Sequence, residues 1–100
     1  MKKREISNSD KEKIIGLISA VLPDAKIYLY GSFARSNQRS WSDIDLALEL
    51  NGKIDFVRIG EIKDVLNASS VPFKFDVVDI NAVSKDIREQ ILKDRVIWKN

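Results

Sequence analysis

Two aspartates with the spacing of metal-binding carboxylates stand in the middle of an otherwise apolar run. Asp43 and Asp45 are separated only by Ile44 in the stretch DIDLALEL, residues 43–50. Side chains two residues apart on a strand leave the same face, with their Cα atoms roughly 6.5–7 Å apart. A lone pair of this kind can simply mark the wet face of a strand. The same separation also lets two carboxylates converge on one hard cation or bridge two.

A third acid occupies a second strand-like run, FKFDVVD, residues 73–79. Strand parity places Asp76 on the face opposite the two phenylalanines, where it can reach Asp43 and Asp45 if the two strands are neighbours. Asp79 has the parity of the apolar face, and we expect a turn at the strand end to expose it to water. Glu49 cannot join the group, because four residues along a strand place it about 13 Å from Asp45.

Three carboxylates gathered on one face predict a cation site. Each pair of charges at ~4 Å repels by about 4 kcal/mol at an effective dielectric constant of 20, so such a cluster takes up a proton or binds a cation. The sequence contains no cysteine and no histidine. An oxygen-only ligand set of this kind favours magnesium or manganese and excludes zinc held by His and Cys.

A Gly-Ser pair between a predicted strand and a predicted short helix adds a candidate phosphate site. Gly31 lets the backbone approach a ligand closely, and the N–H groups that follow at Ser32 are free to bind an anion. A phosphate turn beside a magnesium site indicates nucleotide chemistry. Two metal ions held by carboxylates would stabilise both the attacking and the leaving oxygen of an in-line phosphoryl displacement.

Periodicity and capping residues predict the elements that must position these side chains. We expect four helices alternating with strands, which indicates an α/β (α+β) domain over residues 1–100, with a small mixed sheet of about three strands covered by helices. The tail 95–100 adds a short extended piece. The expected helices begin at the N-caps Ser9 (with Glu12 completing a capping box), Ser32, Asp55 and Ser84. The third helix is expected to bury Ile59, Ile62, Val65 and Leu66. The expected strands are 26–30, 43–50 and 73–79.

Composition narrows the possible partners and compartments. The formal net charge is +2, from 17 Lys and Arg against 15 Asp and Glu, which is too balanced to indicate nucleic-acid binding. The charged start, with MKKR as a solvated end, lacks the apolar segment of a signal peptide, and no run approaches the ~20 apolar residues of a membrane span. We therefore expect a cytoplasmic protein.

The stretch GSFARSNQRSWSDIDLAL, residues 31–48, resembles the G-S-x-A-R-G…S-D-x-D signature of the DNA polymerase beta-like nucleotidyltransferase superfamily. The short length and the run KFDVVDI, residues 74–80, are similar to its minimal nucleotidyltransferase (MNT) branch of MntA-like antitoxins. The resemblance covers about residues 26–80. The sequence departs from the signature at Ser36, where the family usually has glycine, and a positive φ there would strain the backbone.

The resemblance implies a role for each motif residue in a polymerase beta-like palm core. Gly31 and Ser32 would hold the triphosphate of ATP, and Arg35 would contact phosphate or support the turn. Asp43, Asp45 and Asp76 would be both the catalytic residues and the ligands of two Mg²⁺ ions, with Asp76 near the attacking hydroxyl.

The resemblance also implies that AMP is transferred from ATP to an acceptor hydroxyl, with a tyrosine of a helical HEPN-type partner as the acceptor in a toxin–antitoxin pair. A non-catalytic module that neutralises a helical partner by contact is the alternative, and small-molecule modification is a third interpretation. An apolar patch around Trp98 and the last helix would serve for docking.

Three further side chains have two interpretations each. We expect Trp41 to close its loop by packing, with base stacking as the alternative. Lys74 is expected to pair with an aspartate, with a phosphate contact as the alternative. Trp98 is expected to anchor the C-terminal tail.

Overall fold

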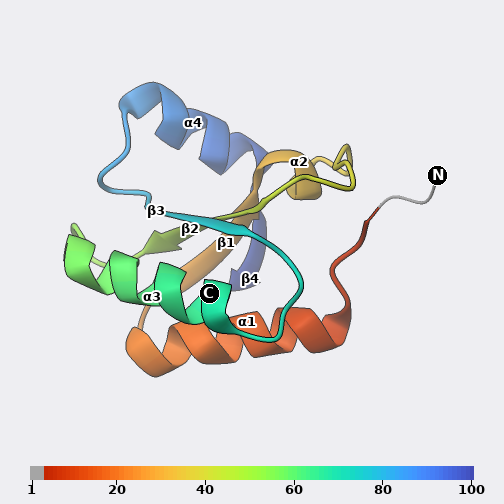
Figure 1. Ribbon diagram of the computed structural model, residues 1–100. Coiled ribbons are helices and arrows are strands. Elements are labelled where there is room, and N and C mark those ends of the chain that lie inside the picture. The colour runs from red at the N-terminus through yellow and green to blue at the C-terminus, as the bar shows by residue number, and fades with distance from the viewer. Residues whose placement is uncertain (1–3) are drawn as a thin grey trace.

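The computed structural model describes residues 4–100; Met1–Lys3, which belong to the charged start, lie outside the described residues. Four helices alternate with four strands along this part of the chain (Figure 1). The elements are α1 (Asn8–Val21), β1 (Lys26–Tyr30), α2 (Gly31–Ala34), β2 (Ile44–Glu49), α3 (Phe56–Ala68), β3 (Phe75–Asp79), α4 (Lys85–Asp94) and β4 (Val96–Lys99).

The strands form one mixed sheet in the order β3-β2-β1-β4. β1 pairs antiparallel with both β2 and β4, while β2 and β3 run parallel and are connected through α3. The sheet therefore has four strands, and the expected number of about three was too low. The extended tail pairs with β1 and becomes β4, a contact that joins segments some 70 residues apart and leaves no trace in local periodicity.

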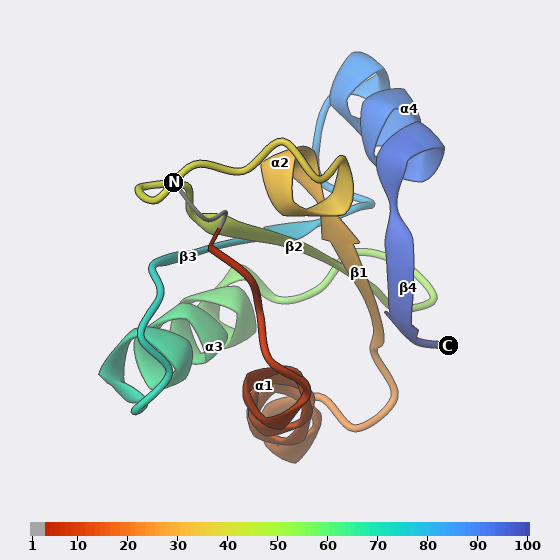
Figure 2. The same ribbon diagram turned by 90° about the vertical axis from the view of Figure 1, so that its right-hand side faces the viewer.

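Helices cover the two faces of the sheet unequally. Figures 1 and 2 show α1 and α3 beneath one face, whereas α4 lies on the other. The alternation of β2 explains the larger core, because Ile44, Leu46 and Leu48 are fully buried against α1 and α3. On the opposite face, Ala47 is fully buried in a smaller cluster with Ile91 of α4. The Asp45 end of that face lies outside this second cluster and is left for the functional site.

Capping follows local hydrogen-bond geometry, and two of the four expected N-caps were wrong. Asp55 and Ser84 cap α3 and α4 as expected, accepting from the backbone N–H of Val57 and Ile87. α1 begins earlier than expected, because Ser7 and not Ser9 accepts from Asp10 N, at 3.0 Å.

α2 has no side-chain cap. It begins at Gly31, so Ser32 lies inside the helix rather than before it.

Most apolar side chains that we expected to be buried are buried, but one at the margin of the core is not. Ile62 and Leu66 of α3 are buried, whereas Val65 is 37% exposed. Trp98 packs against the larger core and anchors β4, as expected. The last helix and strand nevertheless leave four apolar side chains in solvent: Ile87, Leu92, Val96 and Ile97. Among residues 4–100, no helix is long and apolar enough to cross a membrane.

Candidate functional site

The turn between β1 and α2 is shaped by a glycine that no other residue could replace without strain. Gly31 has a φ of 73°, in the left-handed region that L side chains rarely adopt. A Cβ added to Gly31 would also overlap the carboxylate oxygen Oδ2 of Asp45. The turn is closed by backbone hydrogen bonds from Arg35 N to Gly31 O and from Asn37 N to Ser32 O, at 3.1 and 3.0 Å. The predicted phosphate turn therefore lies directly against the predicted metal-binding carboxylate.

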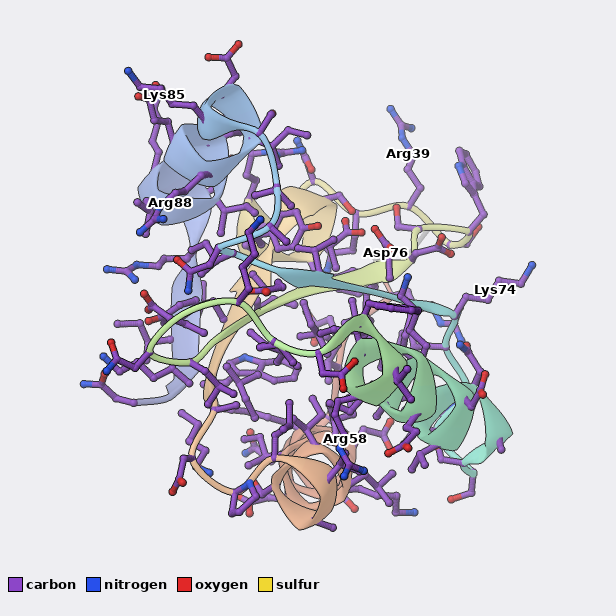
Figure 3. The ribbon with its side chains drawn as sticks, turned by 90° about the vertical axis from the view of Figure 1, so that its left-hand side faces the viewer. Arg39, Arg58, Lys74, Asp76, Lys85 and Arg88 are labelled. Carbon is purple, nitrogen blue, oxygen red and sulfur yellow. The ribbon has the colours of Figure 1, made fainter. Side chains whose placement is uncertain are left out.

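Sheet register brings the predicted acids to one face. Asp45 of β2 lies opposite Asp76 of β3 and opposite Tyr30 of β1, so the three side chains form a row across the sheet. Asp43 precedes β2 and has the same parity as Asp45. The strand facing inferred from the sequence is thus confirmed for both strands, and Figure 3 shows Asp76 on the open side of the sheet.

The three acids influence one another electrostatically. Burial raises the pKa of Asp45 to about 6, with the negative charges of Asp76 and Asp43 adding to the rise and Arg35 opposing it. Burial also raises the pKa of Tyr30 to about 12, reinforced by Asp45 and Asp76. This face therefore disfavours negative charge, and a divalent cation between the carboxylates would relieve that cost.

The carboxylate oxygens suit magnesium chemically, but they do not form a ready-made cage. Across residues 4–100, no three acidic, histidine or cysteine side chains are arranged to hold a metal ion. Asp76 is about half exposed and lies 4.0 Å from Lys63 Nζ of α3. A metal ion shared by Asp43, Asp45 and Asp76 would thus require their side chains to turn inward.

Two other acids are occupied elsewhere. The expectation that a turn would expose Asp79 to water was wrong, because Asp79 is only 5% exposed. It accepts hydrogen bonds from the backbone N–H groups of Ile54 and Asn81, at 2.7 and 2.9 Å, and so fixes the loop before α3. Glu49 accepts from Tyr28 Oη and stays out of the site, as its spacing predicted.

Arg35 and Ser36 follow the turn, and Arg35 connects it to α4. The Arg35 guanidinium forms an ion pair with Asp94 at the end of α4, at 2.9 Å. Hydrogen bonds from Gln90 and Arg35 lower the pKa of Asp94. Ser36 has a φ of 59°, as expected if this position requires a positive φ. The ion pair of Arg35 with Asp94 fits support of the turn, and the phosphate contact stays a prediction.

Neither Trp41 nor Lys74 has the expected partner. Trp41 is 75% exposed, so the packing interpretation was wrong. In the described part of the chain Asp76 pairs with Lys63, not with Lys74. Tyr30 and Lys63 are further neighbours of the acids that were not predicted from the sequence. The antiparallel register of β1 and β2 places Tyr30 opposite Asp45, so knowing that register would have been enough to predict this neighbour. No spacing in the sequence points to Lys63.

The turn and the acid row define a protein class, and comparison with known families agrees. Residues 12–100 match the family described as Polymerase beta, Nucleotidyltransferase. The chain belongs to this family and is a nucleotidyltransferase, a class that generally uses ATP and a divalent metal ion.

Within the family, the chain is similar to proteins named as protein adenylyltransferases. The chain is 26% identical over 93 residues to "Probable protein adenylyltransferase MntA" of Haemophilus influenzae, covering 93% of this chain and 82% of the relative.

Two solved structures are similar in fold and in sequence. A crystal structure of a toxin–antitoxin with AMP-PNP has a TM-score of 0.78 at 29% identity, covering 89% of this chain and 72% of the matched one. A structure of tri-AMPylated Shewanella oneidensis HEPN toxin in complex with MNT antitoxin has a TM-score of 0.69 at 27% identity, covering 88% and 67%.

Proposed function

We propose that this protein is a magnesium-dependent antitoxin that transfers AMP from ATP to a tyrosine hydroxyl of a HEPN-type partner. The observation that carries the proposal is the row of carboxylates beside the Gly31 turn. Asp43, Asp45 and Asp76 share one face, and Asp45 lies against the turn suited to a triphosphate. The MntA relative and the structure containing an AMPylated HEPN toxin support adenylyl transfer to a protein.

Each residue of the site has a task that its position allows. Gly31 gives the triphosphate access to the backbone, and the N–H and hydroxyl of Ser32 donate to it. Asp43, Asp45 and Asp76 would hold two Mg²⁺ ions, which neutralise the charge that develops on the transferred phosphoryl group. Asp76, on the strand farthest from the turn, lies on the acceptor side. Arg35 holds the turn through its ion pair with Asp94.

A protein acceptor also fits the surface of the molecule. Four apolar side chains of α4 and β4 are exposed individually and are available to a docked partner: Ile87, Leu92, Val96 and Ile97. Trp98, by contrast, packs against the core.

Mass spectrometry of both chains after incubation with ATP and magnesium tests the proposal. A gain of one AMP or more on the cognate HEPN-type protein is expected, and Asp43→Asn should abolish it while leaving the fold intact. Robust transfer to a small molecule by this chain alone would overturn the proposal. Tight magnesium-independent binding of the partner without any mass gain would instead favour a non-catalytic binding module.

A further inference from the structure

Asp76 pairs with a cation that comes from the opposite side of the sheet. Lys63 Nζ lies 4.0 Å from Asp76 Oδ1, and the two side chains are 42% and 52% exposed. Figures 1 and 2 show α3, which carries Lys63, on the face that α1 also covers, whereas Asp76 shares the other face with Asp45. Because β3 is an edge strand, a long side chain of α3 can reach past it to the acid row.

The packing of α3 places Lys63 at this edge. Ile62 and Leu66 are buried in the larger core, and Lys63 lies beside them at the margin of the apolar stripe, where it is partly exposed. A lysine at such a margin can lay its aliphatic stem along apolar surface and extend its ammonium group into solvent. The contact with Asp76 therefore follows from how the core orients the helix.

The ion pair offsets repulsion within the acid row. Asp76 lies opposite Asp45 in the sheet register, and its negative charge adds to the raised pKa of Asp45, so the two carboxylates repel each other. Lys63 attracts Asp76 from the edge of the sheet. At 4.0 Å this contact is longer than a hydrogen bond. The attraction is therefore one between charges, and Asp76 can leave Lys63 without breaking a directed bond.

A magnesium ion in the acid row would need the same carboxylate. Asp43, Asp45 and Asp76 have to turn toward one another to hold a metal ion, and Lys63 opposes this movement of Asp76 in two ways. It offers Asp76 a competing partner, and its positive charge repels an approaching cation. Both effects have the same sign, because each raises the magnesium concentration at which the site forms.

We propose that Lys63 is a positioning residue that holds Asp76 at the edge of the sheet and competes with magnesium for it. In the metal-free protein, the ammonium group of Lys63 limits the repulsion between Asp76 and Asp45. When magnesium binds, Asp76 leaves Lys63 and turns toward Asp43 and Asp45. Lys63 thereby sets the magnesium concentration at which the site assembles. This inference rests on the proposed function and adds how the loading of its metal site is controlled.

Magnesium titration of the full chain without nucleotide tests the proposal independently of any transfer assay. The melting temperature is measured over a series of magnesium concentrations, with potassium chloride keeping the ionic strength constant. A ligand that binds only the folded state stabilises it according to the ratio of ligand concentration to Kd, so the series gives a Kd for magnesium. Lys63→Met should lower this Kd about two- to fivefold, the range that one exposed ion pair contributes to an equilibrium constant.

Two matched variants locate the effect. Arg58→Met removes a positive charge from the same helix, where Arg58 pairs with Glu61, and Figure 3 shows Arg58 well away from Asp76. This variant should leave the magnesium Kd unchanged. Lys63→Arg keeps the charge on a side chain of similar reach and should retain the wild-type Kd. A merely structural role of Lys63 would change the melting temperature without magnesium but not the Kd.

The outcomes separate this role from the proposed function. An unchanged or higher Kd in Lys63→Met, or an equal fall in Lys63→Met and Arg58→Met, would overturn the role of Lys63 while magnesium binding stands. A fall in Lys63→Arg as large as that in Lys63→Met would overturn it as well. Absence of any magnesium response in the wild type would instead contradict the proposed function. Lys63→Gln gives the same test if the methionine variant does not fold.

Discussion

Gly31 is constrained by two independent requirements, a left-handed backbone and the close approach of Asp45. The sequence placed Gly31 in a turn between a strand and a helix but did not predict its left-handed backbone. It could not predict the second, since the contact with Asp45 depends on the antiparallel register of β1 and β2. The residue thus couples the geometry of the phosphate turn to that of the carboxylates.

Substitutions in the turn should separate backbone access from a single hydrogen bond. Ser32→Ala should weaken AMP-PNP binding by about 0.5–1.5 kcal/mol, the contribution of one hydrogen bond. Gly31→Val should weaken it much more, because its side chain overlaps Asp45 and its backbone is strained. Titration calorimetry measures both, with thermal unfolding as the check on folding. Equal affinities in the wild type and the two variants would count against the site.

Asp45 should make the stability of the metal-free protein depend on pH. Its pKa of about 6 in the folded state lies above the ordinary carboxyl value of 3.8. Between these values the folded state keeps a proton that the unfolded state loses, so stability falls as pH rises and levels off above pH 6. After allowance for solvent screening of a half-buried group, the loss is about 1–2 kcal/mol.

Urea unfolding in EDTA at pH 4.5 and pH 7.5 measures this dependence. Asp45→Asn should remove the contribution of Asp45 to the pH dependence, and the variant should be more stable than the wild type at pH 7.5. If the free energy of unfolding of Asp45→Asn changes with pH as much as that of the wild type, another group titrates in this range.

Single residues also mark the limits of sequence reasoning. The positive φ of Ser36 followed from the motif position that it occupies. The partners of Lys74 and Asp76 did not follow, because the reach of Lys63 from α3 to Asp76 depends on how closely α3 packs beside β3. The exposure of Trp41 was likewise mispredicted, because an aromatic residue in a polar loop packs only if a neighbour comes close enough.

At the scale of elements, strand parity was the most informative feature of the sequence. Alternation in β2 and β3 correctly placed Asp43, Asp45 and Asp76 on one face. It also gave Asp79 the apolar parity, which is why this residue is buried. Parity could not reveal that two backbone N–H groups would satisfy the buried carboxylate. Helix starts were less predictable, since Ser7 and Ser9 are equally good caps in isolation.

The two aspartates of β3 should therefore respond differently to the same change. Asp76→Asn should eliminate AMP transfer with little effect on stability, because its side chain is half exposed. Asp79→Asn should retain most of the transfer but lower the free energy of unfolding by about 1–3 kcal/mol, because an amide group cannot accept both hydrogen bonds. Denaturant unfolding and a transfer assay on the same samples distinguish the two effects. Loss of transfer in Asp79→Asn alone would mean that β3 is shifted by one residue.

At the scale of the whole molecule, magnesium should stabilise the fold. A ligand that binds only the folded state raises the melting temperature, and the rise should be larger when ATP is also present. Asp43→Asn should abolish this response, because it removes a carboxylate from the row without disturbing the core. Differential scanning fluorimetry with calcium-free buffers measures the effect. An unchanged magnesium response in the variant would contradict the metal assignment.

The pairing of β4 with β1 has a consequence for the order in which the chain folds. Leu29 and Val96 are paired although they are 67 positions apart in the sequence. The contacts of β1 with β2 close much shorter loops, and shorter loops form faster. We therefore expect β4 to dock last and to open first, so its amides should show the earliest hydrogen exchange among the strands. Each opening exposes β1 as a new sheet edge, in addition to the permanent edge at β3, and so offers a further site for pairing with a strand of another molecule.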